Sequence, residues 1–150
     1  MTQNYYFKKH GLFLEDLKIG QKASFKKQIL EKDINLFSQI TGDNNPVHID
    51  EKFANFSIFK KRIAHGFLSG SLISTVIATK LPGPGSIYLN QSLKFLAPVF
   101  IGDIVIAQVT VNEIQSEKKK VILLTECFVS EKKVLTGQAE ILVSVKEEFK

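Results

Sequence analysis

The sequence predicts an α+β fold in which an antiparallel sheet wraps around one long central helix. The first observation is an apolar stretch of helical spacing over residues 66–81, which carries no charge until Lys80. The second is that the chain after this stretch reads as strands joined by short turns. The third is the length, because 150 residues are the size of one ordinary domain, expected to span 1–150.

Shorter elements are expected ahead of the central helix. They are a strand over 22–29, a helix over 31–41, a loop over 43–50 and a short helix over 51–56. Ile34, Phe37 and Ile40 have helical spacing, and Gly42 offers a helix stop because it tolerates positive φ. The Asn45-Pro46 dipeptide indicates a turn inside the expected loop.

The central helix is expected to be buried over most of its circumference. Leu68, Leu72 and Val76 fall on one helical line, and most of the polar residues between them are small. The stretch is too short and too rich in hydroxyl groups to cross a bilayer. Pro82 to Gly85 form a turn that ends it.

The second half of the chain predicts a meander of strands. The expected strands span 87–95, 103–113, 120–129 and 133–145, with a tight turn at 130–132. Alternate residues 105, 107, 109 and 111 are all apolar, which indicates one buried face. A meander around one buried helix is the hotdog architecture.

Composition excludes several classes of protein. The net charge of +5 suits an anionic ligand, but the lysines are scattered and no basic stripe alternates with aromatic residues, so nucleic-acid binding is not expected. Cys127 is the single cysteine, so there is no internal disulfide and no cysteine zinc cluster. The N-terminus lacks the apolar core of a signal peptide, and no membrane association is expected. We therefore predict a cytoplasmic protein.

Asp43 and His48 are the candidate catalytic pair. A carboxylate and an imidazole that lie together can hold one water and move its protons at neutral pH. The alternative is that Asp43 only forms an Asx-turn and His48 is an ordinary loop histidine.

Residues 64–66 precede the central helix and form a second candidate site. A helix N-terminus presents free N–H groups, and Gly66 has no side chain to keep a thioester oxygen away from them. The alternatives are that Gly66 permits a tight turn and His65 caps or packs, or that His65 binds a metal with His48 and Asp43.

Three runs in this order resemble the MaoC-like dehydratases, closest to the (R)-specific enoyl-CoA hydratases. They are TGDNNPVHID, IAHGFLSGSLIS and LPGPGSIYLNQSLKFLAPVFIGD. The resemblance covers the chain from about residue 12 to its end. It implies a hotdog homodimer that binds an acyl thioester between helix and sheet, near the subunit interface.

The resemblance also assigns roles to residues. Asp43, His48 and the N–H of Gly66 match catalytic groups, Asn45 matches an asparagine that orients the loop, and Ser74 matches a serine near the aspartate. We expect Asn45, His65 and Ser74 to take part in substrate binding. Phe67 stands where relatives often carry Met. From the basic run beside this segment we add Lys60, Lys61 and Arg62 as candidate ligands of the carrier's phosphates.

The implied reaction is reversible hydration of a trans-2-enoyl-CoA to the (R)-3-hydroxyacyl-CoA, with Asp43 as the expected base and His48 holding the water. It needs no cofactor, because hydration is redox-neutral, and no metal is expected. Alternatives left open are a 3-hydroxyacyl-carrier-protein dehydratase, a hotdog thioesterase and a non-catalytic module that binds acyl thioesters.

Overall fold

A computed structural model describes residues 2–149, which form five strands and several helices. The strands are β1 (Lys22–Gln28), β2 (Ile87–Phe95), β3 (Ile104–Gln115), β4 (Lys120–Val129) and β5 (Lys132–Leu142). The α-helices are α1 (Thr2–Lys9), α2 (Glu31–Thr41), α3 (Pro46–Ile49), α4 (Glu51–Phe56) and α5 (Gly66–Thr79). Short 3-10 turns lie at Leu14–Asp16, Ser116–Lys118 and Lys146–Phe149.

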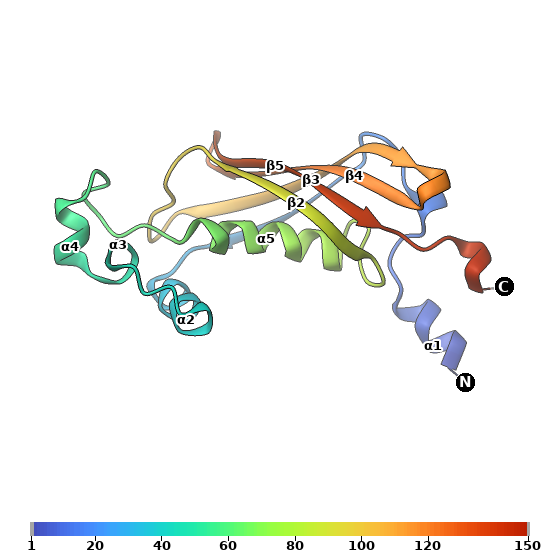
Figure 1. The fold of residues 1–150 in the computed structure, drawn as a ribbon, viewed down its shortest axis with the longest axis horizontal. Coiled ribbons are helices and arrows are strands. Elements are labelled where there is room, and N and C mark those ends of the chain that lie inside the picture. Colours follow the sequence, from blue (N-terminus) through green and yellow to red (C-terminus); the bar gives the residue numbers. More distant parts are fainter. Residues whose placement is uncertain (1, 150) are drawn as a thin grey trace.

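The strands form one antiparallel sheet in the order β1-β3-β4-β5-β2. Figure 1 shows this sheet lying along one side of α5, with α2, α3 and α4 gathered near the start of that helix. The N-terminal helix α1 and the C-terminus lie at the opposite end (Figure 1). The predicted α+β hotdog arrangement, with the sheet around a central helix, is confirmed.

The core lies between α5 and the concave face of the sheet. Ile73, Val76 and Ile77 of the helix are buried, as are the four alternating residues 105 to 111 of β3. The alternation that predicted one buried face of β3 is therefore confirmed. No helix within residues 2–149 is long and apolar enough to span a bilayer.

Burial of α5 over most of its circumference was a wrong expectation for the single chain. One side of the helix is open, and Phe67, Ser71, Ser74 and Ala78 on it are exposed. The physical reason is that one sheet can cover only one side of a helix. The apolar residues of β2 are likewise largely exposed, because β2 is an edge strand.

Several elements also differ from the sequence-based expectation. Residues 46–49 of the expected loop form the short helix α3, because Asn45 caps it and Pro46 suits a first helical position. The last strand ends at Leu142 rather than 145, and Val143 instead donates its N–H to the carbonyl of Lys119. Helix α1 was not predicted.

Candidate active site

Gly42 and Asn45 shape the loop that carries Asp43. Gly42 ends α2 with a φ of 77°, a left-handed conformation that glycine adopts without strain. Asp43 Oδ1 then accepts a hydrogen bond from the N–H of Asn45 at 3.3 Å, and Asn45 Oδ1 accepts one from Val47 at 3.2 Å. The Asx-turn considered as an alternative is therefore present, and it starts the helix that carries His48.

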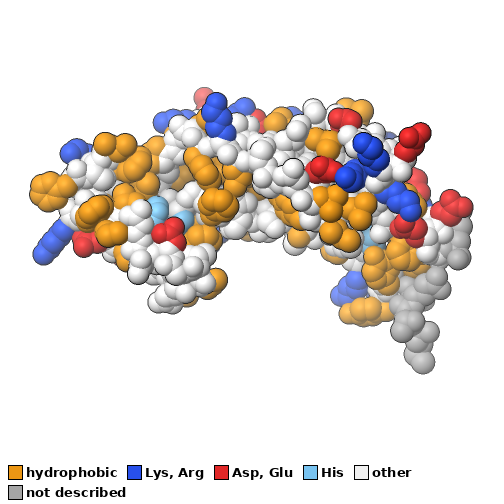
Figure 2. All heavy atoms as spheres, viewed as in Figure 1, with side chains coloured by type: hydrophobic (Ala, Val, Ile, Leu, Met, Phe, Trp, Pro, Cys, Tyr) orange, Lys and Arg blue, Asp and Glu red, His pale blue; other side chains and the backbone are white. Residues whose placement is uncertain are grey.

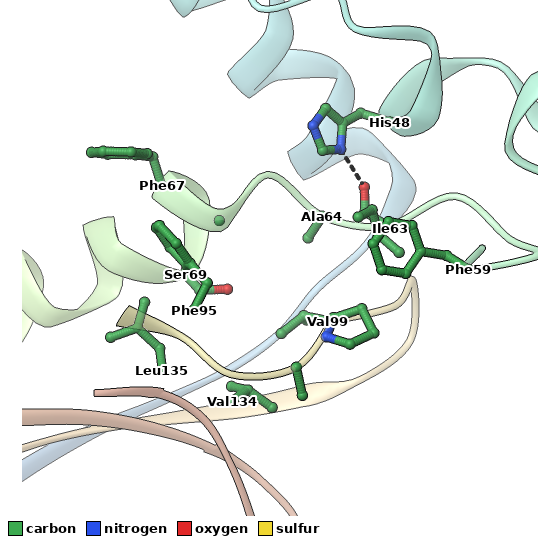
Figure 3. A pocket seen from close by; sticks show the side chains of 13 residues that line it. His48, Phe59, Ile63, Ala64, Phe67, Ser69, Phe95, Val99, Val134 and Leu135 are labelled. Carbon is green, nitrogen blue, oxygen red and sulfur yellow. Dashed lines mark hydrogen bonds between the residues drawn. The ribbon is translucent and has the colours of Figure 1, made fainter. Parts of the chain in front are cut away.

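His48 lies in the last turn of α3, and its side chain is only 9% exposed. Its Nδ1 is 2.8 Å from the carbonyl oxygen of Ile63, drawn as the dashed line in Figure 3. A carbonyl can only accept, so Nδ1 carries the hydrogen and Nε2 of the neutral ring keeps its lone pair. This contact fixes both the tautomer and the direction of the ring.

The surroundings of His48 keep its ring neutral at pH 7. Burial lowers the pKa of His48 below its ordinary value of 6.5, and the neighbouring His65 lowers it further. The hydrogen bond to Ile63 and the charge of Asp43 act in the opposite direction but do not outweigh burial. Nε2 is therefore available as an acceptor at neutral pH.

Asp43, His48 and His65 converge near the start of α5. One carboxylate oxygen and one nitrogen from each ring all lie within 4.8 Å of one another. Two acceptors about 4.5–4.8 Å apart can share one water that donates a hydrogen to each. Asp43 is exposed, and Figure 2 shows histidine atoms beside an acidic side chain at the surface here. Asp43 and His48 can therefore hold one water from solvent.

His65 is placed behind the pair, not on a substrate surface. It is 2% exposed, its ring stacks on that of His48 at 3.9 Å, and its Nε2 lies 2.9 Å from the carbonyl oxygen of Asp43. Sequence analysis assigned it to substrate binding, and in this chain it instead holds the main chain of Asp43.

The same three residues are a candidate donor set for a cation. Nδ1 of His48 and Nε2 of His65 already contact carbonyl oxygens, so each ring has one nitrogen left. The remaining nitrogen of His65 is buried without a hydrogen-bond partner among the described residues. One nitrogen of His65 thus faces a carbonyl oxygen and the other is buried, so the residues fit a metal poorly.

Gly66 begins α5, where N–H groups have no acceptor inside the helix. A Cβ built at this position would lie 2.6 to 3.1 Å from ring atoms of Phe95. Any other residue would therefore have to displace this ring. The glycine brings the helix N-terminus close to Phe95 and leaves its backbone open.

His48 and Gly66 both line a cavity of about 270 Å³. Its walls are apolar except at His48 and Ser69, and Phe59, Phe67 and Phe95 are its aromatic members (Figure 3). Sequence analysis missed Phe59 and Phe95 as wall residues, since neither stands in a pattern of spacing that marks it. The cavity can accept an apolar chain whose polar end reaches His48 and Gly66.

The three residues of the basic run, Lys60, Lys61 and Arg62, differ in their exposure to solvent. Lys60 and Lys61 are exposed, as a phosphate-binding role requires. Arg62 is 8% exposed and its donors contact His48, Glu31 and Asn35. Its assignment as a phosphate ligand was therefore wrong, because the side chain is buried and each guanidinium nitrogen already contacts an acceptor within the protein.

Ser74 lies two turns beyond Gly66, about 12 Å along the helix at 1.5 Å per residue. It is exposed on the open side of α5 and does not line the cavity. Within one chain the structure does not bring it to the Asp43–His48 pair.

Comparison with known proteins identifies a family for most of the chain. The model of the MaoC like domain matches residues 15–132. The chain is 53% identical to an (R)-specific enoyl-CoA hydratase from Rhodospirillum rubrum, over 87% of this chain and 91% of the relative. It is 46% identical to a 3-hydroxybutyryl-CoA dehydratase from Methylorubrum extorquens, over 91% and 87% respectively. An R-hydratase structure from Pseudomonas aeruginosa superposes with a TM-score of 0.85 at 44% identity, covering 91% of this chain and 88% of that one.

Proposed function

Because the chain belongs to the MaoC-like domain family, we propose that Asp43 and His48 add water to a trans-2-enoyl thioester bound in the apolar cavity. The protein is a hydro-lyase that converts trans-2-enoyl-CoA to (R)-3-hydroxyacyl-CoA. The observation that carries the site assignment is that His48 and Gly66 line one apolar cavity, while a carboxylate oxygen of Asp43 lies within 4.8 Å of a ring nitrogen of His48.

Two parts of the substrate contact the protein, the acyl chain and the thioester oxygen. Its acyl chain fills the apolar cavity, and its thioester oxygen accepts a hydrogen bond from the N–H of Gly66. This N–H and the positive end of α5 stabilise negative charge that develops on the oxygen during addition. Polarisation of the carbonyl makes C3 electrophilic.

One water bridges Asp43 and His48 and attacks C3. Both groups accept a hydrogen from it, so an oxygen lone pair remains for the new C3–O bond. One O–H bond of the water breaks, its proton passes to the pair, and the pair delivers that proton to C2. Since the neutral His48 has no hydrogen at Nε2, we keep Asp43 as the base and His48 as the group that orients the water.

We also propose that two copies of the chain pair through the open side of α5 and the edge strand β2. Phe67 on this side is 66% exposed, and Ile87 and Leu89 of β2 are exposed as well. Figure 2 shows hydrophobic side chains gathered over β2 and over the α4 end. Apolar surface and an unpaired strand edge favour association, which would also cover Ser74. A sedimentation mass of 16.9 kDa, that of a monomer, for the fully active protein would overturn this.

The carrier and the compartment are finer points of the same proposal. The relatives named above act on CoA thioesters, so CoA is the proposed carrier, and comparing kcat/KM for one acyl group on CoA and on acyl carrier protein tests this. A cytoplasmic location and a single domain over 1–150 stay predictions.

The test is direct. Purified protein is mixed with crotonyl-CoA, and the ultraviolet band of the enoyl thioester is followed together with chiral analysis of the product. We expect loss of the band and only (R)-3-hydroxybutyryl-CoA. Formation of the (S) product, or release of free CoA as a thioesterase would give, contradicts the proposal.

A further inference from the structure

Arg62 is a buried cation that contacts three acceptors. Its Nε lies 2.6 Å from the carbonyl oxygen of His48, NH1 lies 2.5 Å from Glu31 Oε1, and NH2 lies 3.1 Å from Asn35 Oδ1. Arginine is almost never fully buried unless it is paired. The three contacts give each nitrogen of the guanidinium an acceptor, which explains how the cation is tolerated inside the protein.

The Arg62–Ile63 segment completes the C-terminal end of α3. The last carbonyls of a helix have no partner within it. Here the carbonyl of Val47 accepts from Ile63 N at 3.4 Å, and that of His48 accepts from Arg62 Nε. The carbonyl of Ile63 accepts in return from His48 Nδ1. Three hydrogen bonds thus join the helix that carries His48 to two consecutive residues.

Glu31 and Asn35 connect the same guanidinium to α2, the helix whose C-terminal end leads into Asp43. Arg62 therefore contacts both elements that deliver the catalytic pair. Lysine could not do the same, because only the planar guanidinium presents donors in several fixed directions at once.

We propose that Arg62 is a positioning residue for the hydration reaction, which holds the main chain of His48 at a fixed place relative to α2 and Asp43. The inference rests on the proposed function, since it takes the pair as the catalytic groups. Arg62 itself touches neither substrate nor water. A displacement of about 1 Å at a catalytic group can lower a rate about 100-fold, so loss of this contact is expected to affect turnover.

The experiment compares Arg62→Gln and Arg62→Lys with the wild type on crotonyl-CoA. Rates are expressed per folded molecule, with the folded fraction and Tm measured by circular dichroism. We expect Arg62→Gln to lower kcat about 10- to 100-fold and leave KM little changed, because the acyl cavity does not depend on the guanidinium. Arg62→Lys, which keeps the charge, should recover part of the lost kcat.

Lys27→Gln is the matched control, because it removes an ion pair with Asp33 on the same helix α2 without touching the His48 segment. It should leave kcat unchanged. A purely structural role for Arg62 predicts a lower Tm with unchanged kcat per folded molecule, and that result overturns the inference. If Arg62→Gln does not fold, an unchanged kcat in Arg62→Lys overturns it equally.

The same measurements distinguish failure of the proposed function from failure of the positioning role of Arg62. If the wild type does not hydrate crotonyl-CoA, the function itself is wrong. If it does, and Asp43→Asn is inactive while both Arg62 variants turn over normally, only the positioning role is wrong.

Discussion

The sheet with α5 and the α2–α4 end of the molecule are held together by different interactions. In the first region, completely buried apolar side chains such as Ile73, Leu123 and Ile141 fill the space between helix and sheet. In the second, side chains bond to the main chain, as Asn45 does at Val47 and Asp50 at Phe53. The catalytic pair lies in the second region and the acyl cavity borders both.

This difference indicates which property each region controls. Apolar contacts are non-directional and scale with buried area, so the sheet and α5 determine stability. Hydrogen bonds to carbonyl groups are directional, so the α2–α4 end determines where Asp43 and His48 point. Substitutions in the two regions should therefore separate stability from turnover.

The largest expected effect is on turnover and comes from the catalytic pair. Asp43→Asn and His48→Gln should each lower kcat about 10²- to 10⁴-fold, the usual cost of a lost general acid or base. The Tm of Asp43→Asn should stay near that of the wild type, since this side chain is exposed and lies outside the apolar core. Steady-state kinetics with crotonyl-CoA measures the first effect, and thermal unfolding the second.

The double variant sharpens this prediction. Because both groups act on one water, the combined loss should be smaller than the product of the single losses. Near-normal turnover in either single variant would show that the site is elsewhere.

The opposite result is expected for Ile73→Ala in the core of α5. It should lower the free energy of unfolding by about 2–5 kcal/mol, because the side chain is completely buried and leaves a cavity. Urea denaturation measures this, and kcat per folded molecule should be unchanged.

Ala78→Ser on the open side of the same helix is the control for a single chain, and at protein concentrations where the monomer prevails it should change stability by less than about 0.5 kcal/mol. Equal losses at Ile73 and Ala78 would mean that the two sides of α5 do not differ in packing.

The third prediction concerns the pH dependence of kcat/KM, and the expected effect is of intermediate size. His48 works as the neutral ring and its pKa is lowered, mainly by burial. Activity should therefore persist as pH falls to 6.5, and kcat/KM should drop about tenfold per pH unit only below the lowered pKa. A kcat/KM profile with its acid midpoint at or above 6.5 would contradict the neutral, buried histidine.

The same shift has a consequence for stability, and its sign follows from proton uptake. The relevant pH range lies between the lowered pKa of His48 in the folded protein and its ordinary pKa of 6.5. In this range the unfolded chain binds a proton at His48 and the folded chain does not. Stability from this group is thus present above 6.5 and lost as pH falls through that window. In His48→Gln, the free energy of unfolding should depend less on pH in this range.

The sequence predicts the sheet and α5 better than it predicts the site. Alternation in β3 follows directly from which face is buried. Helix α2 lies where the spacing predicted it, but of the three spaced residues only Ile34 is buried and Ile40 is 82% exposed. The open side of α5 could not be predicted in the same way, because small residues suit a helix that packs on a second surface as well as one that is buried in its own chain.

Within the site, the pair itself could be predicted but its support could not. Asp43 and His48 are five residues apart, so local turn geometry brings them together. Arg62 looked like part of a solvated basic run, and its burial depends on Glu31 and Asn35, which lie 31 and 27 residues away in sequence. No local pattern specifies acceptors at that separation.

The smallest expected effect is at the two lysines that remain candidates for phosphate binding. Exposed charge pairs contribute about 0.2–1 kcal/mol each. At about 0.2–0.5 kcal/mol for each lysine, the lower part of this range, Lys60→Gln with Lys61→Gln should raise KM for crotonyl-CoA about two- to fivefold and weaken its dependence on salt. The value of kcat should not change, because neither residue contacts the pair.

The matched control is Lys8→Gln with Lys9→Gln, which removes the same charge from α1 at the far end of the molecule (Figure 1). If both double variants shift KM equally, the effect comes from net charge rather than from a local phosphate site. If Lys60 and Lys61 can be neutralised with no change in KM across a salt series, the basic run has no part in binding. Arg62 would then act only inside the protein, as a support of the catalytic pair.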